Sequence, residues 1–147
     1  MSPGDADQIS RIILDNLYNV NIRDYGKLTV DCLATFYSPD LISKYALNEI
    51  TLVANENNFI LGTASLDGER IRNVFVRIDQ HKKGIGSELV SAIEKIAGQK
   101  SIRRLYLYSN ISVVMFYTKL GYQKIEDISE EIAGEPIPMV RMEKILE

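Results

Sequence analysis

The chain has 147 residues, of which 46% are hydrophobic and 25% are charged. This is the usual balance of a globular protein, and it argues against intrinsic disorder. The formal net charge of −3 disfavours a surface built mainly to bind nucleic acid phosphates. Cys32 and His81 are the single cysteine and the single histidine, so neither an internal disulfide nor a four-ligand Cys/His zinc cluster is expected. We expect one domain over residues 1–147, cytoplasmic and not attached to a membrane, because the chain shows neither a signal-peptide pattern nor a long apolar run.

The first third of the chain is predicted to be helical. Apolar residues in 5–19 recur at the spacing of one helix face, with Asp5 as a plausible cap. Residues 28–37 suggest a second helix, which Ser38-Pro39-Asp40 interrupts, and residues 41–47 suggest a short third one.

From residue 50 the pattern changes to strands. Residues 50–54 and 59–66 flank an Asn-rich turn, as in a hairpin, and Asp67-Gly68 marks a second turn. Residues 71–78 then alternate, with Val74, Val76 and Ile78 expected on one face and Asn73, Phe75 and Arg77 on the other.

The second half alternates helices with strands. Residues 84–98 have helical spacing and end at Gly98, residues 104–108 form a strand, and residues 110–121 form a helix that Asn110 can cap. Two extended stretches follow, at 122–128 and 139–145. The strand, crossover helix and strand between residues 71 and 108 predict a parallel pair. The fold class is therefore α/β (α+β), with a mixed, mostly antiparallel central sheet and helices on both faces.

The loop from Asp79 to Ser87 joins a strand directly to a helix and contains Gly84 and Gly86. Glycines allow close approach of a ligand to the backbone, and free N–H groups at a helix start favour an anion. Five basic residues lie between positions 70 and 83, against a single acidic one, in a chain that is acidic overall. The loop fits neither a dinucleotide-binding nor a Walker fingerprint. It therefore predicts a phosphate site of another kind, although the glycines could simply permit a tight connection.

The segment His81-Lys82-Lys83-Gly84-Ile85-Gly86 resembles the Gln/Arg-x-x-Gly-x-Gly/Ala signature of the Gcn5-related N-acetyltransferases, except at its first position. Val74-Phe75-Val76 looks like the acetyl-CoA strand of that family, and residues 110–122 look like the second half of its cofactor site. The order of elements matches over nearly the whole chain, although the usual first strand is truncated or missing. This resemblance implies the GNAT fold and acetyl-CoA as the acyl donor.

The resemblance also implies roles for particular residues. Backbone groups of Val74, Phe75 and Val76 would bind the pantetheine arm and the thioester carbonyl, and Asn110 would lie near that arm. The pyrophosphate would be held at the glycine loop. The loop residues concerned are His81, Lys82, Lys83, Gly84, Ile85, Gly86 and Ser87.

Two further residues are candidates for proton transfer. Tyr117 would approach the sulfur and act as the general acid that protonates the leaving thiolate, although it could instead be a core tyrosine. Many relatives carry a glutamate on the strand before the glycine loop, where this sequence has Arg72 and Asn73. Glu69, in the preceding turn, is a weak candidate for the general base, and a water relayed by backbone groups or a residue from another segment is the alternative.

The expected reaction is transfer of the acetyl group of acetyl-CoA to a primary amine by direct attack in a ternary complex. The acceptor would be a small-molecule amine or a peptide amine, and the acidic residues between 126 and 135 could attract a cation. The alternative is a non-catalytic acyl-CoA-binding sensor or interaction module on the same fold. No nucleic acid partner is expected, and a homodimer is plausible for the family.

Overall fold

The computed structural model describes residues 1–2 and 4–147. Strands and helices follow one another in the predicted order. The strands are β1 (Ile50–Glu56), β2 (Phe59–Asp67), β3 (Arg70–Val76), β4 (Arg104–Asn110), β5 (Gln123–Ile132) and β6 (Glu135–Ile145). The α-helices are α1 (Asp5–Asn16), α2 (Ile22–Tyr25), α3 (Lys27–Ala34), α4 (Pro39–Tyr45), α5 (Ile85–Gln99) and α6 (Val114–Lys119).

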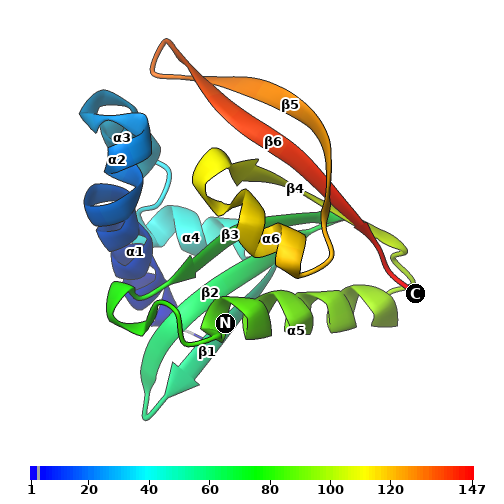
Figure 1. Ribbon diagram of the computed structural model, residues 1–147. Coiled ribbons are helices and arrows are strands. Elements are labelled where there is room, and N and C mark those ends of the chain that lie inside the picture. Colours follow the sequence, from blue (N-terminus) through cyan, green and yellow to red (C-terminus); the bar gives the residue numbers. More distant parts are fainter. Residues whose placement is uncertain (3) are drawn as a thin grey trace.

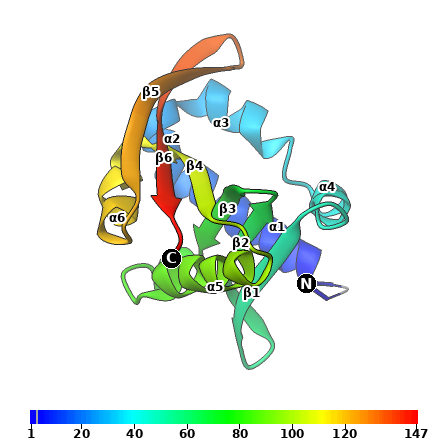
Figure 2. The same cartoon turned by 90° about the vertical axis from the view of Figure 1, so that its right-hand side faces the viewer.

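The six strands form one sheet in the order β1-β2-β3-β4-β6-β5 (Figure 1). Every neighbouring pair is antiparallel except β3 and β4, which are parallel and are connected through α5. The N-terminal helices lie on one face of the sheet, and α5 with α6 lies on the other (Figures 1 and 2). The predicted fold class is therefore confirmed.

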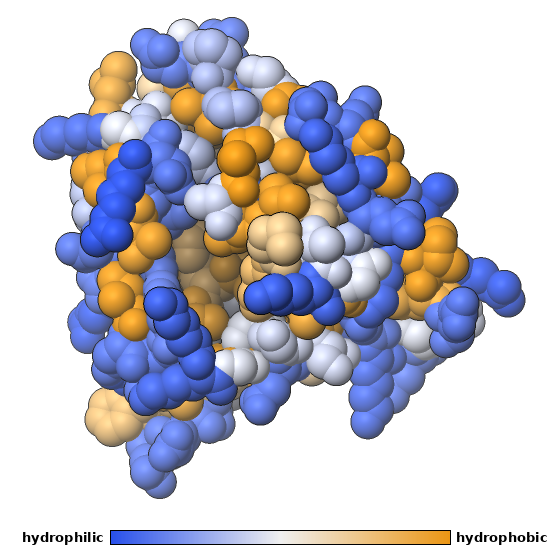
Figure 3. All heavy atoms as spheres, in the orientation of Figure 1, coloured by the Kyte–Doolittle hydropathy of each residue, from blue (hydrophilic) through white to orange (hydrophobic). Residues whose placement is uncertain are grey.

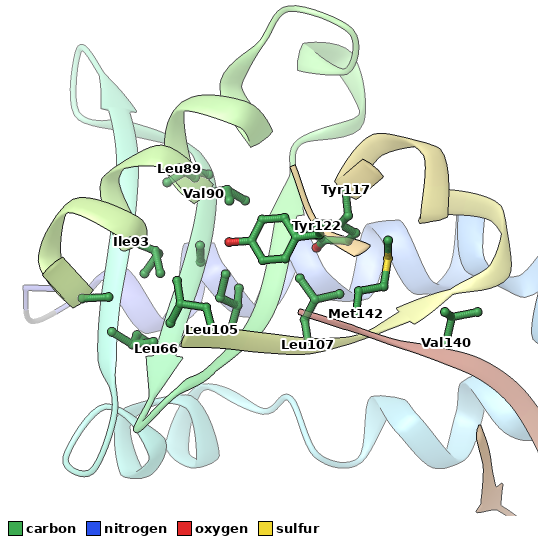
Figure 4. Packing of buried hydrophobic residues seen from close by; sticks show 13 residues of the cluster. Leu66, Leu89, Val90, Ile93, Leu105, Leu107, Tyr117, Tyr122, Val140 and Met142 are labelled. Carbon is green, nitrogen blue, oxygen red and sulfur yellow. The ribbon is translucent and has the colours of Figure 1, made fainter. Parts of the chain in front are cut away.

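Two hydrophobic cores hold these layers together. Beneath α5, Leu89 and Ile93 pack against Leu105 and Leu107 of β4, and Met142 of β6 completes the layer (Figure 4). On the opposite face the buried residues of α1 pack on the sheet. The second core contains Ala6, Ile9, Ile12, Ile13, Leu17, Val30, Ile42 and Ile60. Strands β1, β2 and β3 therefore contribute side chains to both cores.

Several predicted ends differ from the structure. Gly4, and not Asp5, is the N-cap of α1, and the Asp5 carboxylate instead accepts a hydrogen bond from the Ser2 N–H at 2.6 Å. Gly98 lies inside α5, because this helix continues to Gln99. The predicted hairpin turn is present, with Asn57 and Asn58 both at positive φ. Asparagine tolerates this conformation better than most residues.

The predicted strand 71–78 is shorter and irregular. It ends at Val76, and Ile78 begins a 3₁₀ turn instead of extending the strand. Its register with β2 shifts by one residue between the pairs Ser65–Arg72 and Thr63–Phe75. Asn73, at φ 55°, lies at this bulge. The extra residue places Ile71 on the α5 face with Val74 and Val76, and it breaks the simple alternation expected from the sequence.

No helix within residues 1–2 and 4–147 is long and apolar enough to cross a membrane.

Candidate active site

Strands β3 and β4 are paired at one end and separate toward the other. Their register has a single pair, Arg70 with Tyr106, and the Tyr106 N–H donates to the Glu69 carbonyl at 3.0 Å. Beyond that point, the backbone N–H and C=O groups that β3 and β4 turn toward each other form no hydrogen bonds between the two strands. Main-chain groups of this kind need hydrogen-bond partners, and a ligand can supply them.

The gap opens into a cavity of about 1000 Å³. Side chains of both sheet faces line it, because Val74, Leu107 and Tyr117 belong to the α5 side and Tyr37 and Tyr108 belong to the other. Figure 3 shows the hollow on the surface, between the N-terminal helices and α6. One continuous volume therefore passes through the sheet where β3 and β4 separate.

The structure brings most of the predicted cofactor residues to this cavity. Those that line it are Val74, Phe75, Val76, His81, Lys82, Gly84, Ile85, Gly86, Ser87, Asn110 and Tyr117. Lys83 is exposed outside the lining. Glu69 is likewise exposed in the β2–β3 turn and is not among the lining residues, so its position gives the predicted base role no support.

Two residues of the glycine loop have a left-handed backbone, Gly84 and the non-glycine Lys82 at φ 65°. Gly84 is the N-cap of α5 at φ 84°, in the left-handed region that favours glycine. A Cβ on Gly86 would lie 3.2 Å from Cζ of Phe116, so this glycine allows α6 to approach the start of α5. The first N–H groups of α5 face the cavity without intrahelical partners, and the helix dipole adds partial positive charge there.

Only part of the β3 backbone faces the gap. The Arg77 N–H donates to the Leu61 carbonyl at 2.8 Å, which makes Val76 and Gly62 a non-hydrogen-bonded pair. The main-chain groups of Val76 and Val74 therefore point toward β4. The Phe75 carbonyl lies on the β2 side, 3.0 Å from where a Gly62 Cβ would be. Phe75 contributes its side chain instead, which packs edge-on against Tyr37.

The Val76 carbonyl is already occupied within the chain. Asn16 donates to it from α1 at 2.9 Å, and Nε2 of His81 lies 2.8 Å away on the other side. Asn16 also donates to the Ile12 carbonyl and is buried. The open end of β3 is thus anchored to both α1 and the glycine loop.

Tyr117 is buried on α6, between the rings of Phe116 and Tyr122. Burial raises the pKa of Tyr117 above its usual value, so the phenol stays protonated at neutral pH. Its neighbour Tyr122 donates to Glu94 at 2.8 Å, and Glu94 also contacts Lys144 at 3.1 Å. This contact joins the end of α6 to α5, beside Tyr117, which lines the cavity.

Asn110 does not act as the predicted helix cap. Its side chain makes no capping bond and instead accepts a hydrogen bond from the Tyr25 hydroxyl of α2. Burial, with Asp24 and Glu130 adding negative charge nearby, raises the pKa of Tyr25 to about 12. The contact links the N-terminal helices to the separated end of β4.

Several cavity residues were not expected from the sequence. Asn16, Tyr25, Tyr37, Arg70 and Glu130 all line it. Asn16 had a detectable signal, because it is a polar residue on the apolar face of α1. The other four residues lie in segments whose orientation toward the cavity depends on tertiary structure.

A family model described as an acetyltransferase (GNAT) domain matches residues 21–146. The chain belongs to this GNAT acetyltransferase family. The resemblance seen in the sequence is thereby confirmed, and the GNAT domain includes every strand of the sheet.

Solved structures share the fold of this chain, and curated proteins of Bacillus subtilis match part of its sequence. The GNAT fold is shared with a GCN5-related N-acetyltransferase from Rhodopseudomonas palustris, with 24% identity, a TM-score of 0.91 and coverage of 99% of this chain and 92% of that one. PaiA N-acetyltransferase from Thermoplasma acidophilum, solved in complex with coenzyme A, has 19% identity and a TM-score of 0.77, with coverage of 99% and 95%. YyaT of Bacillus subtilis is 31% identical over 96 residues, which is 63% of each chain. The chain thus spans less than two thirds of the curated relatives it matches.

Proposed function

We propose that this protein transfers the acetyl group of acetyl-CoA to a primary amine, by direct attack within a ternary complex. The cavity through the sheet is the observation that carries the proposal. Donor and acceptor can enter from opposite faces of one volume and meet where β3 and β4 separate, without a covalent enzyme intermediate.

The cavity wall suits coenzyme A. Phosphates would bind the N–H groups at the start of α5, with Lys82 beside them. The amide-rich pantetheine arm would pair with the gap-facing backbone of Val74 and with the Val76 N–H, since the Val76 carbonyl is occupied. Acetyl-CoA supplies the activated acyl group as a thioester. PaiA N-acetyltransferase, a protein of the same fold, was solved in complex with coenzyme A, which supports coenzyme A as the ligand.

The reaction forms a C–N bond and breaks the C–S bond of the thioester, and it requires two proton transfers. The attacking amine loses a proton, and the leaving thiolate gains one. Tyr117 is the proposed general acid, because it lines the cavity and its phenol is protonated at neutral pH. Glu130 is the proposed proton acceptor in place of Glu69, since it is the one acidic side chain that lines the cavity in residues 1–2 and 4–147.

Cofactor binding and turnover can be tested separately. Acetyl-CoA at about a hundred times its dissociation constant should stabilise the fold by roughly 2.7 kcal/mol in thermal melting. Release of free thiol with a panel of amines then distinguishes an enzyme from a non-catalytic acyl-CoA binder, which would show the stabilisation without the thiol.

Two variants test the assigned roles. Tyr117→Phe should lower kcat by about a hundredfold or more while leaving acetyl-CoA binding unchanged, and the control Tyr18→Phe removes an exposed hydroxyl elsewhere. Glu130→Gln should lower kcat. Glu131→Gln, an exposed neighbour, is its control. Normal turnover in Tyr117→Phe would exclude the proposed acid.

A further inference from the structure

An arginine without a carboxylate partner lines the acceptor side of the cavity. Arg70 is the first residue of β3, and its guanidinium carbon lies 4.5 Å from the centre of the Tyr108 ring. Its Nε is buried and has no hydrogen-bond partner in the part of the chain that the structure describes. A buried donor left in this way is costly unless a ligand satisfies it.

The neighbouring arginines differ from Arg70 in this respect. Arg72 lies 3.7 Å from both Glu49 and Asp67, and Arg141 donates from Nε to Glu143 at 2.9 Å. No carboxylate of the described residues lies within 4 Å of the Arg70 guanidinium. Arg70 is therefore charged, oriented by an aromatic ring and available to an anion.

Coenzyme A phosphates are too far away to be that anion. A strand rises about 3.3 Å per residue, so the six steps from Arg70 to Val76 span roughly 20 Å, and the glycine loop lies beyond Val76. Arg70 also points away from the α5 face. Its neighbour Ile71 is buried under α5, and Tyr108 alternates with the buried Leu107 of β4. The anion must come from the opposite face, where the acceptor enters.

We propose that the acceptor is a primary amine that also carries a carboxylate, as an amino acid does, and that Arg70 binds this carboxylate. The inference rests on the proposed function. A guanidinium binds a carboxylate through two parallel N–H···O bonds, and the Tyr108 ring fixes the plane of that fork. A simple polyamine would leave Arg70 unpaired.

The test compares amino acids with the amines formed by their decarboxylation: lysine with cadaverine, phenylalanine with phenethylamine, and tyrosine with tyramine. In at least one pair, kcat/KM should favour the amino acid more than tenfold. Arg70→Gln should reduce that ratio by about ten- to a hundredfold, mainly through KM, and Arg70→Lys should have an intermediate effect. Arg103→Gln, which changes an exposed arginine outside the cavity, should leave the ratio unchanged.

A binding measurement separates this inference from the proposed function. With coenzyme A saturating, the preferred amino acid should raise the melting temperature of the wild-type protein but not that of Arg70→Gln, whose own binding of coenzyme A should be retained. Such binding without thiol release with any amine would support the carboxylate site and refute the transferase. Thiol release with ratios near one in all pairs, or a ratio unchanged in Arg70→Gln, would overturn the carboxylate site and leave the transferase intact.

Discussion

The double anchor at the Val76 carbonyl makes a quantitative prediction about stability. This oxygen accepts hydrogen bonds from Asn16 at 2.9 Å and from His81 at 2.8 Å, and Asn16 makes a second bond to the Ile12 carbonyl. A typical intramolecular hydrogen bond contributes about 0.5–1.5 kcal/mol net, so Asn16→Ala should cost about 2 kcal/mol. In a chain of this length that corresponds to a fall of about 4–8 °C in Tm.

The shared acceptor should make the two donors interdependent. After either single substitution, the carbonyl keeps one hydrogen bond. In the double variant Asn16→Ala/His81→Ala it keeps neither, and the cost of an unsatisfied acceptor is added. We therefore expect the double variant to be less stable than the sum of the single effects by about 1 kcal/mol. Its acetyl-CoA affinity should fall as well, because the end of β3 loses its position.

Urea unfolding of the four proteins in this cycle measures the coupling. Asn19→Ala is a matched control, since Asn19 makes the same kind of bond to the residue four positions earlier, Asp15, at 2.9 Å, but on the exposed surface. It should cost less than about 0.5 kcal/mol. Additive losses in the cycle, or an equal loss in Asn19→Ala and Asn16→Ala, would refute the shared anchor.

Two further predictions concern a matched glycine pair and a titrating tyrosine. Gly84→Ala should destabilise the fold by about 1–2 kcal/mol, because the position requires φ 84°. Gly98→Ala should stabilise the fold by about 0.5–1 kcal/mol, since an added Cβ inside α5 meets open space. Thermal unfolding that shows the same sign for both variants would contradict this reasoning. The pKa of Tyr25 rises from 10 to about 12 on folding, so the unfolded chain releases this proton first and the free energy of unfolding should fall as pH rises through that interval. Urea unfolding at alkaline pH should show a weaker pH dependence in Tyr25→Phe, and an unchanged dependence would exclude Tyr25 as a source.

The sequence predicted those features that depend on local periodicity. Helical spacing between Gly84 and Gly98 and alternation in the strands were sufficient for the order of elements and the fold class. The conformation of the glycine loop was predictable only at Gly84, which takes the left-handed φ that glycine favours, because the role of Gly86 depends on its tertiary contact with Phe116. Helix ends were predicted less well. Gly98 is a common stop signal, yet the packing of α5 on the sheet carries the helix past it.

The acceptor side of the site could not be predicted in the same way. Glu130 is one of several acidic residues in the final hairpin, and only the pairing of β5 with β6 determines that it lines the cavity while Glu131 is exposed. Tyr25 and Asn110 are 85 positions apart, and their contact depends on the packing of α2 over the end of β4. Contacts between residues so far apart in the chain produce no periodic pattern in the sequence.

The bulge at Asn73 accounts for the largest difference between expectation and structure. In a regular strand, Arg70 and Arg72 would share a face with Val74 and Val76, and both arginines would lie on the α5 side of the sheet. The extra residue reverses this relation. Val74 and Val76 face α5, and Arg70 lies on the other face against Tyr108. One inserted residue thus separates Arg70 from the basic residues of the glycine loop, which is the charge arrangement that the proposed negatively charged donor and carboxylate-bearing acceptor would require.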